Sequence, residues 1–247
     1  MKKGIVVGVI ALAGMMLTGC VSSHSSSGVT NSANVVSPVK AAQSSQKRIW
    51  VDVESDWSNI SENDTAENIY VTQNGKVNFY QMYGAHPGDM LSLDSWPKMS
   101  TAKVVKIAKK GDEESLTSRD GDTESLPKSQ YKAPVPSVLK GQVRSDNGKI
   151  TGEKMSYYAY SISTETGKLE KDKYDAFQNY ESVVPATVIG YKTIQGQKYG
   201  YLTTKKEFDD SGKMRMRTYL VTKLKKNQKL QFDQTGTPNV SKEKSGK

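Results

Sequence analysis

The 247-residue sequence predicts a mainly β fold of the α+β class, arranged as an antiparallel meander or a partly closed barrel, with one short helix near residues 100–110. Three observations carry this prediction. Turn signals built on Asn-Gly or a similar pair recur along the chain, and the segments between them are rich in β-branched and aromatic residues. The spacing of apolar residues becomes helical only after Pro97.

The first twenty residues have the layout of an export signal. Lys2 and Lys3 precede an uncharged apolar run, residues 4–16, and Leu17-Thr18-Gly19-Cys20 follows, with small residues just before the cysteine. The run is shorter than the roughly 20 apolar residues that a transmembrane helix needs. We therefore interpret residues 1–19 as a signal peptide.

Residues 1–20 resemble the signal peptide of bacterial lipoproteins, with its lipobox. The resemblance implies that cleavage makes Cys20 the first residue, that its thiol receives a diacylglyceryl group, and that the protein lies on the outer face of the cell membrane. Two acyl chains suffice for stable anchoring, whereas one chain gives only marginal binding. The alternative is that residues 4–16 form a core helix and that Cys20 is a small buried side chain.

Residues 20–47 are expected to form the lipidated cysteine and a disordered tether, because almost no aromatic residue is present to support a core. Folded sequence is expected from Arg48, in an N-terminal β-rich region, residues 48–110. A hairpin over residues 69–80 is its strongest element, since Asn74-Gly75 tolerates the positive φ angles of a tight turn.

A short helix completes this N-terminal region. Ser100 is expected to cap it and Gly111 to end it. Its inward face is expected to carry Ala102, Val105, Ile107 and Ala108.

Residues 111–137 are acidic and then proline-containing, which indicates a linker or mobile loop. A C-terminal antiparallel β region, residues 138–234, and a disordered tail, residues 235–247, are expected to follow. Residues 171–180 could add a helical turn. Turn signals of the β region occur at residues 146–149, 165–168, 194–197 and 210–213.

The most strongly alternating segment, residues 213–224, offers a candidate anion-binding row. A period of two places Lys213, Arg215, Arg217 and Lys223 on one face of a strand. Arginine can hold a phosphate in bidentate geometry. The alternative is an ordinary solvated face, or an edge strand protected from aggregation by charge.

Tyrosines offer a candidate ligand groove. Tyr158 and Tyr160 share one face of a predicted strand, and Tyr199 and Tyr201 share one face of another. Phenolic rings can stack on sugars or apolar groups while their hydroxyls form hydrogen bonds. The alternative is core packing, because half-buried strands commonly contain tyrosine.

Cysteine and histidine usage argues against several kinds of chemistry. Cys20 is the only cysteine, so the mature domain has no disulfide, thiolate metal site or cysteine nucleophile of its own. Its two histidines, His24 and His86, are isolated in sequence, and neither a glycine-rich phosphate loop nor a hydrolase motif occurs. We therefore expect no enzyme, no cofactor and no metal.

The formal net charge of +9 favours an anionic partner. Outside the cytoplasm this means lipid headgroups or, in a Gram-positive envelope, anionic wall polymers, and nucleic acid is not expected. The alternative is that the lysines only keep a β-rich domain soluble.

We therefore expect a membrane-anchored extracytoplasmic lipoprotein with a noncatalytic β-rich binding domain. A structural or exclusion protein that contacts another envelope protein, and a cell-wall hydrolase, are the alternatives. In general style the folded part resembles uncharacterised β-rich lipoproteins of Gram-positive bacteria, a resemblance that implies no functional residue.

Overall fold

The computed structural model describes residues 34–55, 59–82, 85–86, 90–117, 127–162, 169–175, 188–208 and 214–243. The predicted mainly β fold of the α+β class is confirmed: among the described residues strands dominate, two α-helices are present, and the strands do not form a closed barrel.

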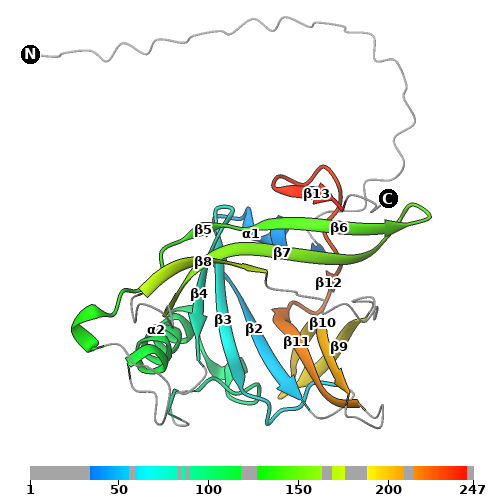
Figure 1. Cartoon of the computed structure of the whole chain (residues 1–247). Helices are drawn as coiled ribbons and strands as arrows, with labels where there is room; N and C mark the ends of the chain where they lie inside the picture. Colours follow the sequence, from blue (N-terminus) through cyan, green and yellow to red (C-terminus); the bar gives the residue numbers. More distant parts are fainter. Residues whose placement is uncertain are drawn as a thin grey trace, which may run out of the picture. The chain divides into compact units, whose positions relative to one another are not determined.

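The larger sheet contains seven strands, and every neighbouring pair in it is antiparallel. The strand order is β5 (Ser137–Val138), β4 (Lys76–Gln81), β3 (Ala66–Gln73), β2 (Arg48–Ser55), β11 (Met214–Leu224), β10 (Gln197–Phe208) and β9 (Ile189–Ile194). Strand β2 pairs with β11, with Val51 opposite Val221. The regions predicted as residues 48–110 and 138–234 therefore share one sheet (Figure 1).

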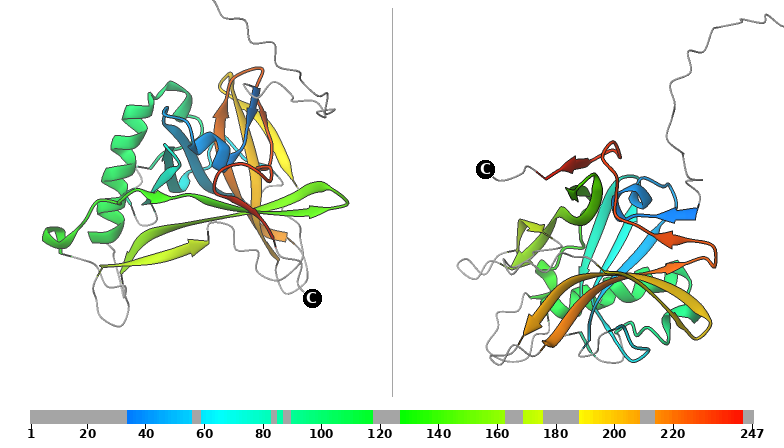
Figure 2. Two further views of the ribbon diagram at one scale, coloured as in Figure 1. Left: turned by 90° about the horizontal axis from the view of Figure 1, so that it is seen from above. Right: turned by 90° about the vertical axis from the view of Figure 1, so that its right-hand side faces the viewer.

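A second sheet runs across the strands of the first (Figures 1 and 2). Its order is β13 (Val240–Lys242), β6 (Lys140–Asp146), β7 (Lys149–Ile162) and β8 (Leu169–Asp175). Two predictions were wrong here. Residues 171–175 continue a strand, because β7 offers them a pairing edge that satisfies their backbone groups. The tail is ordered through β13, which pairs in parallel with β6 and is held by an ion pair of 2.6 Å between Arg144 and Glu243.

The chain begins to fold before Arg48, which corrects the predicted extent of the tether. Strand β1 (Val35–Val36) pairs in parallel with β12 (Lys229–Leu230), and helix α1 (Pro38–Ala42) follows it. Val36, Val39 and Ala42 are buried. Composition missed this segment because its buried apolar residues, Val36, Pro38, Val39 and Ala42, are small and include no aromatic ring.

A buried carboxylate, Asp233, holds this N-terminal segment in place. It accepts hydrogen bonds from the Ser37 hydroxyl at 2.9 Å, from the Val39 amide at 2.6 Å and from the Lys40 amide at 2.8 Å. These groups lie at the start of α1, where helical amides lack partners within the helix. The Asp233 amide in turn donates to the carboxylate of Glu153 at 2.9 Å, and burial raises the pKa of Glu153 well above its ordinary value.

The larger sheet has a core on each face. The helix-side core contains Ile49, Val51 and Ile69, and it is covered by α2 (Thr101–Thr117) and the loop around Trp96. The opposite, sheet-side core packs Trp50 and Tyr70 against residues of β7 such as Tyr157. Adjacent residues of β2 and β3 thus enter different cores, as strand alternation requires.

Three of the predicted turns have the backbone that their sequences indicated. The φ angles are 52° at Asn74 and 73° at Gly75, 47° at Asn147 and 77° at Gly148, and 49° and 77° at residues 195 and 196. These left-handed conformations are those favoured in tight hairpins. The turn signals at 165–168 and 210–213 lie outside the described residues.

Helix α2 is longer than predicted. Ser100 caps it, since its hydroxyl accepts the Lys103 amide at 3.2 Å, but the helix continues past Gly111 to Thr117. Gly111 packs closely against Met82, which directly follows β4, and a Cβ at position 111 would overlap the Met82 side chain. The glycine therefore permits close packing and does not end the helix. Residues 111–117 are helix, not linker, and Ala102 is exposed, not inward-facing.

A buried carboxyl group on α2 predicts a pH effect on stability. Asp112 accepts hydrogen bonds from the Gln81 amide at 2.9 Å and from the Tyr131 hydroxyl at 2.8 Å, and burial raises its pKa to about 6. The folded state therefore favours the protonated acid. This stabilising contribution is complete below about pH 4 and is lost as the pH rises through 6.

We expect Asp112→Asn, which cannot ionise, to gain about 2 kcal/mol of stability relative to the original chain as the pH rises from 4 to 7. Urea unfolding of both proteins at pH 4, 5, 6 and 7 measures this difference. A stability difference that is independent of pH would contradict the prediction.

Candidate functional site

Cys20, the predicted lipidation site, lies outside the described residues, as do all of residues 1–33. Among the residues that the structure describes, no helix has the length and apolarity needed to cross a membrane. The same residues contain no group of three or more His, Cys, Asp or Glu side chains placed to hold a metal ion.

The structure interrupts the predicted basic row. Tyr219 and Val221, which share its face of β11, are fully buried in the helix-side core. They separate Arg217, which is half-buried, from Lys223. Lys213 and the side chain of Arg215 lie outside the described residues. The side chains of β11 alternate between two faces as predicted, but the face of the predicted basic row carries core residues in its middle and is not one solvated row.

Lys223 has a structural position. Its ammonium group donates to the Trp96 carbonyl at 2.6 Å and lies 5.3 Å from the centre of the Trp96 ring. Partial burial lowers its pKa. The side chain thus ties β11 to the loop before α2, and its charge is turned toward backbone carbonyls and an aromatic face.

The four candidate tyrosines do not line one groove. Tyr199 is fully buried against Trp96, at 5.4 Å between ring centres, and donates to the Leu93 carbonyl at 3.2 Å. Tyr201 packs edge-on against Tyr219 in the same core. Tyr158 is exposed on β7 of the other sheet, and the side chain of Tyr160 lies outside the described residues. Core packing, the alternative considered above, therefore accounts for Tyr199 and Tyr201.

A cleft of about 270 Å³ lies on the helix-side face of the larger sheet, where α2 leaves the end of the β3–β4 hairpin uncovered. The register places Gln73 opposite Lys76 and Val71 opposite Asn78 on this face. Val105 and Lys109 of α2 form the facing wall. The site is therefore built by the end of the β3–β4 hairpin, by α2, and by the residues just before β2 and β5.

We call this site the lysine cleft, after its charged residues. Apolar contact comes from Val71, Val105, Pro136 and the ring of Tyr80. The polar lining is Lys47, Gln73, Asn74, Lys76, Asn78 and Lys109.

Positive charge in the lysine cleft is not compensated by the described residues around it. Lys47, Lys76 and Lys109 are exposed, and among the described residues none of them forms an ion pair. The described lining contains no Asp or Glu. Three ammonium groups around one hollow favour an anion, although their exposure makes the attraction sensitive to salt.

One amide in the lysine cleft has an unused acceptor. The Oδ1 atom of Asn78 is buried and receives no hydrogen bond from a described residue. The Asn78 side chain also forms a hydrogen bond with the phenol of Tyr80. Burial raises the pKa of Tyr80, and this hydrogen bond opposes the rise. A buried acceptor without a partner costs about 1–3 kcal/mol, so a donor from a ligand would be favoured here.

Sequence reasoning missed the lysine cleft because its residues meet only through pairing and packing. Lys76 follows the Asn74-Gly75 turn directly, and its place on a strand was predictable. Lys47 falls in the predicted tether, and Lys109 falls in the predicted helix, with no sequence signal that joins them. Only the β2–β3 register and the position of α2 bring the three together.

No family model, no curated protein and no solved structure matches the chain. The function of the lysine cleft must therefore be judged from its shape, charge and hydrogen-bonding groups.

Proposed function

We propose that this chain is a lipoprotein anchored through Cys20 on the outer face of the cell membrane, and that its β-rich body binds a ligand in the lysine cleft without chemical conversion. Leu17-Thr18-Gly19-Cys20 supports the anchor. The observation that carries the binding role is the hollow lined by three lysines with no acidic partner among the described residues.

The lysine cleft favours binding over the two alternatives. Hydrolysis of a glycosidic bond ordinarily uses two facing carboxyl groups, and the described lining of the cleft has none. A structural or exclusion role requires no such hollow. Ammonium and amide groups around a small opening instead supply attraction and orientation, which are the properties of a binding site.

The length of the chain between Cys20 and the described residues limits the reach of the proposed anchor. Residues 21–33 separate Cys20 from Asn34, the first described residue. Fully extended, this length of chain spans at most about 50 Å. A lipid at Cys20 would therefore keep the binding domain close to the membrane surface.

We expect Cys20→Ser to abolish anchoring, because serine has no thiol to form the thioether with the lipid. The variant should appear in the soluble fraction or persist as a precursor that retains residues 1–19. Membrane fractionation and mass spectrometry of the amino terminus measure both outcomes. Ser25→Ala is the matched control and should behave as the original chain. Unchanged retention and processing of Cys20→Ser would refute the anchor.

A further inference from the structure

We infer that the lysine cleft binds a phosphate ester that also carries a free hydroxyl group. This inference names the ligand class of the binding site proposed above, so it rests on that site, but it is independent of the anchor at Cys20. The charge of the lysines indicates the phosphate, one buried acceptor indicates the hydroxyl, and the size of the hollow limits the rest of the ligand.

The phosphate is indicated by three separate ammonium groups. Lys47 precedes β2, Lys76 begins β4 and Lys109 lies on α2, so the three lysines line the hollow from three separate segments. Each ammonium group has three donors, and a phosphate offers several acceptor oxygens that can face different directions. A carboxylate has only two oxygens in one plane and fits this arrangement less well.

The hydroxyl is indicated by Asn78. Its buried Oδ1 atom is an acceptor and repels an anionic oxygen, so it does not contribute to phosphate binding. Oδ1 is closed to solvent in the structure, so a ligand hydroxyl reaches it only when the Asn78 side chain turns toward the hollow. After that turn the hydroxyl can donate to Oδ1 and remove the cost of the unused acceptor. Asn78 and Lys76 lie on the same face of β4, so the acceptor and a cation are neighbours two residues apart.

The size of the hollow indicates a small group. Its volume of about 270 Å³ is slightly below the roughly 300–1,000 Å³ of pockets for drug-sized ligands. Val71 and Val105 provide apolar walls that suit the carbon chain of a small polyol. Glycerol 3-phosphate combines these features and serves as the probe.

Two sources could present this chemistry: a membrane lipid headgroup and a soluble or polymeric phosphate ester. The segment that ends at Lys47 is fixed to the tip of the β3–β4 hairpin, through hydrogen bonds from the Asn74 amide to Ser44 and from the Gly75 amide to Ala42. One wall of the cleft thus belongs to the chain that leads from the proposed anchor, which makes both sources accessible.

Isothermal titration calorimetry of the full chain in non-ionic detergent at low salt tests the ligand class. We expect saturable binding of glycerol 3-phosphate and of inorganic phosphate. Combined Lys47→Gln, Lys76→Gln and Lys109→Gln substitutions should weaken both by at least about tenfold. Asn78→Leu should weaken glycerol 3-phosphate by about fivefold and leave inorganic phosphate unchanged, because only the former has a hydroxyl group.

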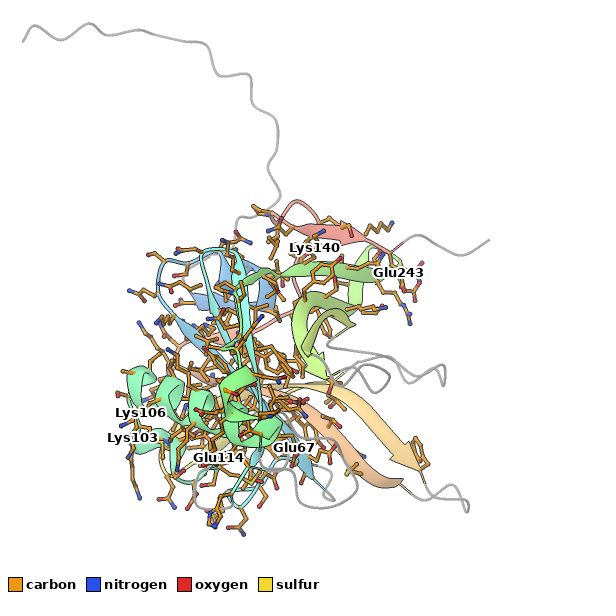
Figure 3. All side chains as sticks on the ribbon, turned by 60° about the vertical axis from the view of Figure 1, so that its left-hand side comes forward. Glu67, Lys103, Lys106, Glu114, Lys140 and Glu243 are labelled. Atoms are coloured by element: carbon orange, nitrogen blue, oxygen red, sulfur yellow. The ribbon has the colours of Figure 1, made fainter. Side chains whose placement is uncertain are left out.

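Lys103, Lys106 and Lys140 provide the matched control, because their combined change to Gln removes the same charge outside the cleft. Figure 3 shows Lys103 and Lys106 on the side of α2 turned away from the strands, and Lys140 at the second sheet. This control should bind both probes normally. An equal loss in the control, or no binding of glycerol 3-phosphate by the original chain, would overturn the inference. Acetate binding without phosphate binding would overturn the ligand class and leave the binding function standing.

The source is distinguished by chemical acetylation of lysines in the full chain, mixed with vesicles of phosphatidylcholine with or without phosphatidylglycerol. Protection of Lys47, Lys76 and Lys109 by phosphatidylglycerol, with unchanged labelling of the three control lysines, would support the inference with a lipid headgroup as the source. Protection by soluble glycerol 3-phosphate alone would support it with a soluble ester. Absence of protection in both arms would contradict it. None of these readouts depends on the outcome for Cys20→Ser.

Discussion

Replacement of Asp233 by Ala should lower the free energy of unfolding by about 3 kcal/mol and the melting temperature by about 10 °C. The variant leaves the Ser37 hydroxyl and the amides of Val39 and Lys40 without their acceptor. The substitution also removes a carboxylate beside Glu153, whose pKa is raised by burial and by Asp233. That relief reduces the loss but does not cancel it, because three hydrogen bonds to one carboxyl group disappear.

Calorimetric melting and amide hydrogen exchange measure this effect. The amides of Val39 and Lys40 should exchange much faster in Asp233→Ala. Gln231→Ala, an exposed change two residues away, is the control and should alter stability by less than about 0.5 kcal/mol. Normal protection of both amides in Asp233→Ala would show that another contact holds the N-terminal segment.

Gly190→Ala should cost about 2 kcal/mol, because a Cβ at this position would overlap the ring of Tyr201. Gly190 and Tyr201 are opposite each other in the β9–β10 pair. The ring would have to leave its edge-on contact with Tyr219, whose ring centre is 5.2 Å away. Both rings are buried, so the displacement would propagate into the helix-side core.

Gly152→Ala is the matched control for this prediction. Gly152 also lies in a strand, but no atom beyond its chain neighbours would contact its new Cβ. It should be neutral or slightly stabilising, because alanine has less freedom in the unfolded state. Urea unfolding of both variants measures the contrast. Equal losses would mean that strand glycines matter here for backbone reasons and not for the Tyr201 ring.

The hairpin turns and the start of α2 were predictable from the sequence, because they depend on interactions between residues that are close together in the chain. Asn74-Gly75 and Asn147-Gly148 favour positive φ angles by themselves, so the hairpins around them need no distant partner. Ser100 caps α2 through a bond to a residue three positions away. Gly111 was wrongly predicted to end α2, because a glycine that ends a helix and a glycine that permits close packing look the same in the sequence.

The parts that depend on distant pairing were not predictable. Alternation placed Arg217 and Lys223 on one face, but the sequence does not show that Tyr219 and Val221, between them, meet a second layer. The small residues at 36–42 become core only because Asp233 and β12 lie nearby. The lysine cleft, likewise, exists only once strand register and helix position are set.

Pairing between β2 and β11 joins residues more than 160 positions apart in the middle of the larger sheet. If the chain emerged from a membrane pore with its amino end first, β2 would appear long before its partner β11. Until β11 appeared, the incomplete sheet would have an open edge and little stability. The two halves of the larger sheet therefore cannot join until β11, near the carboxyl end of the chain, is available to pair with β2.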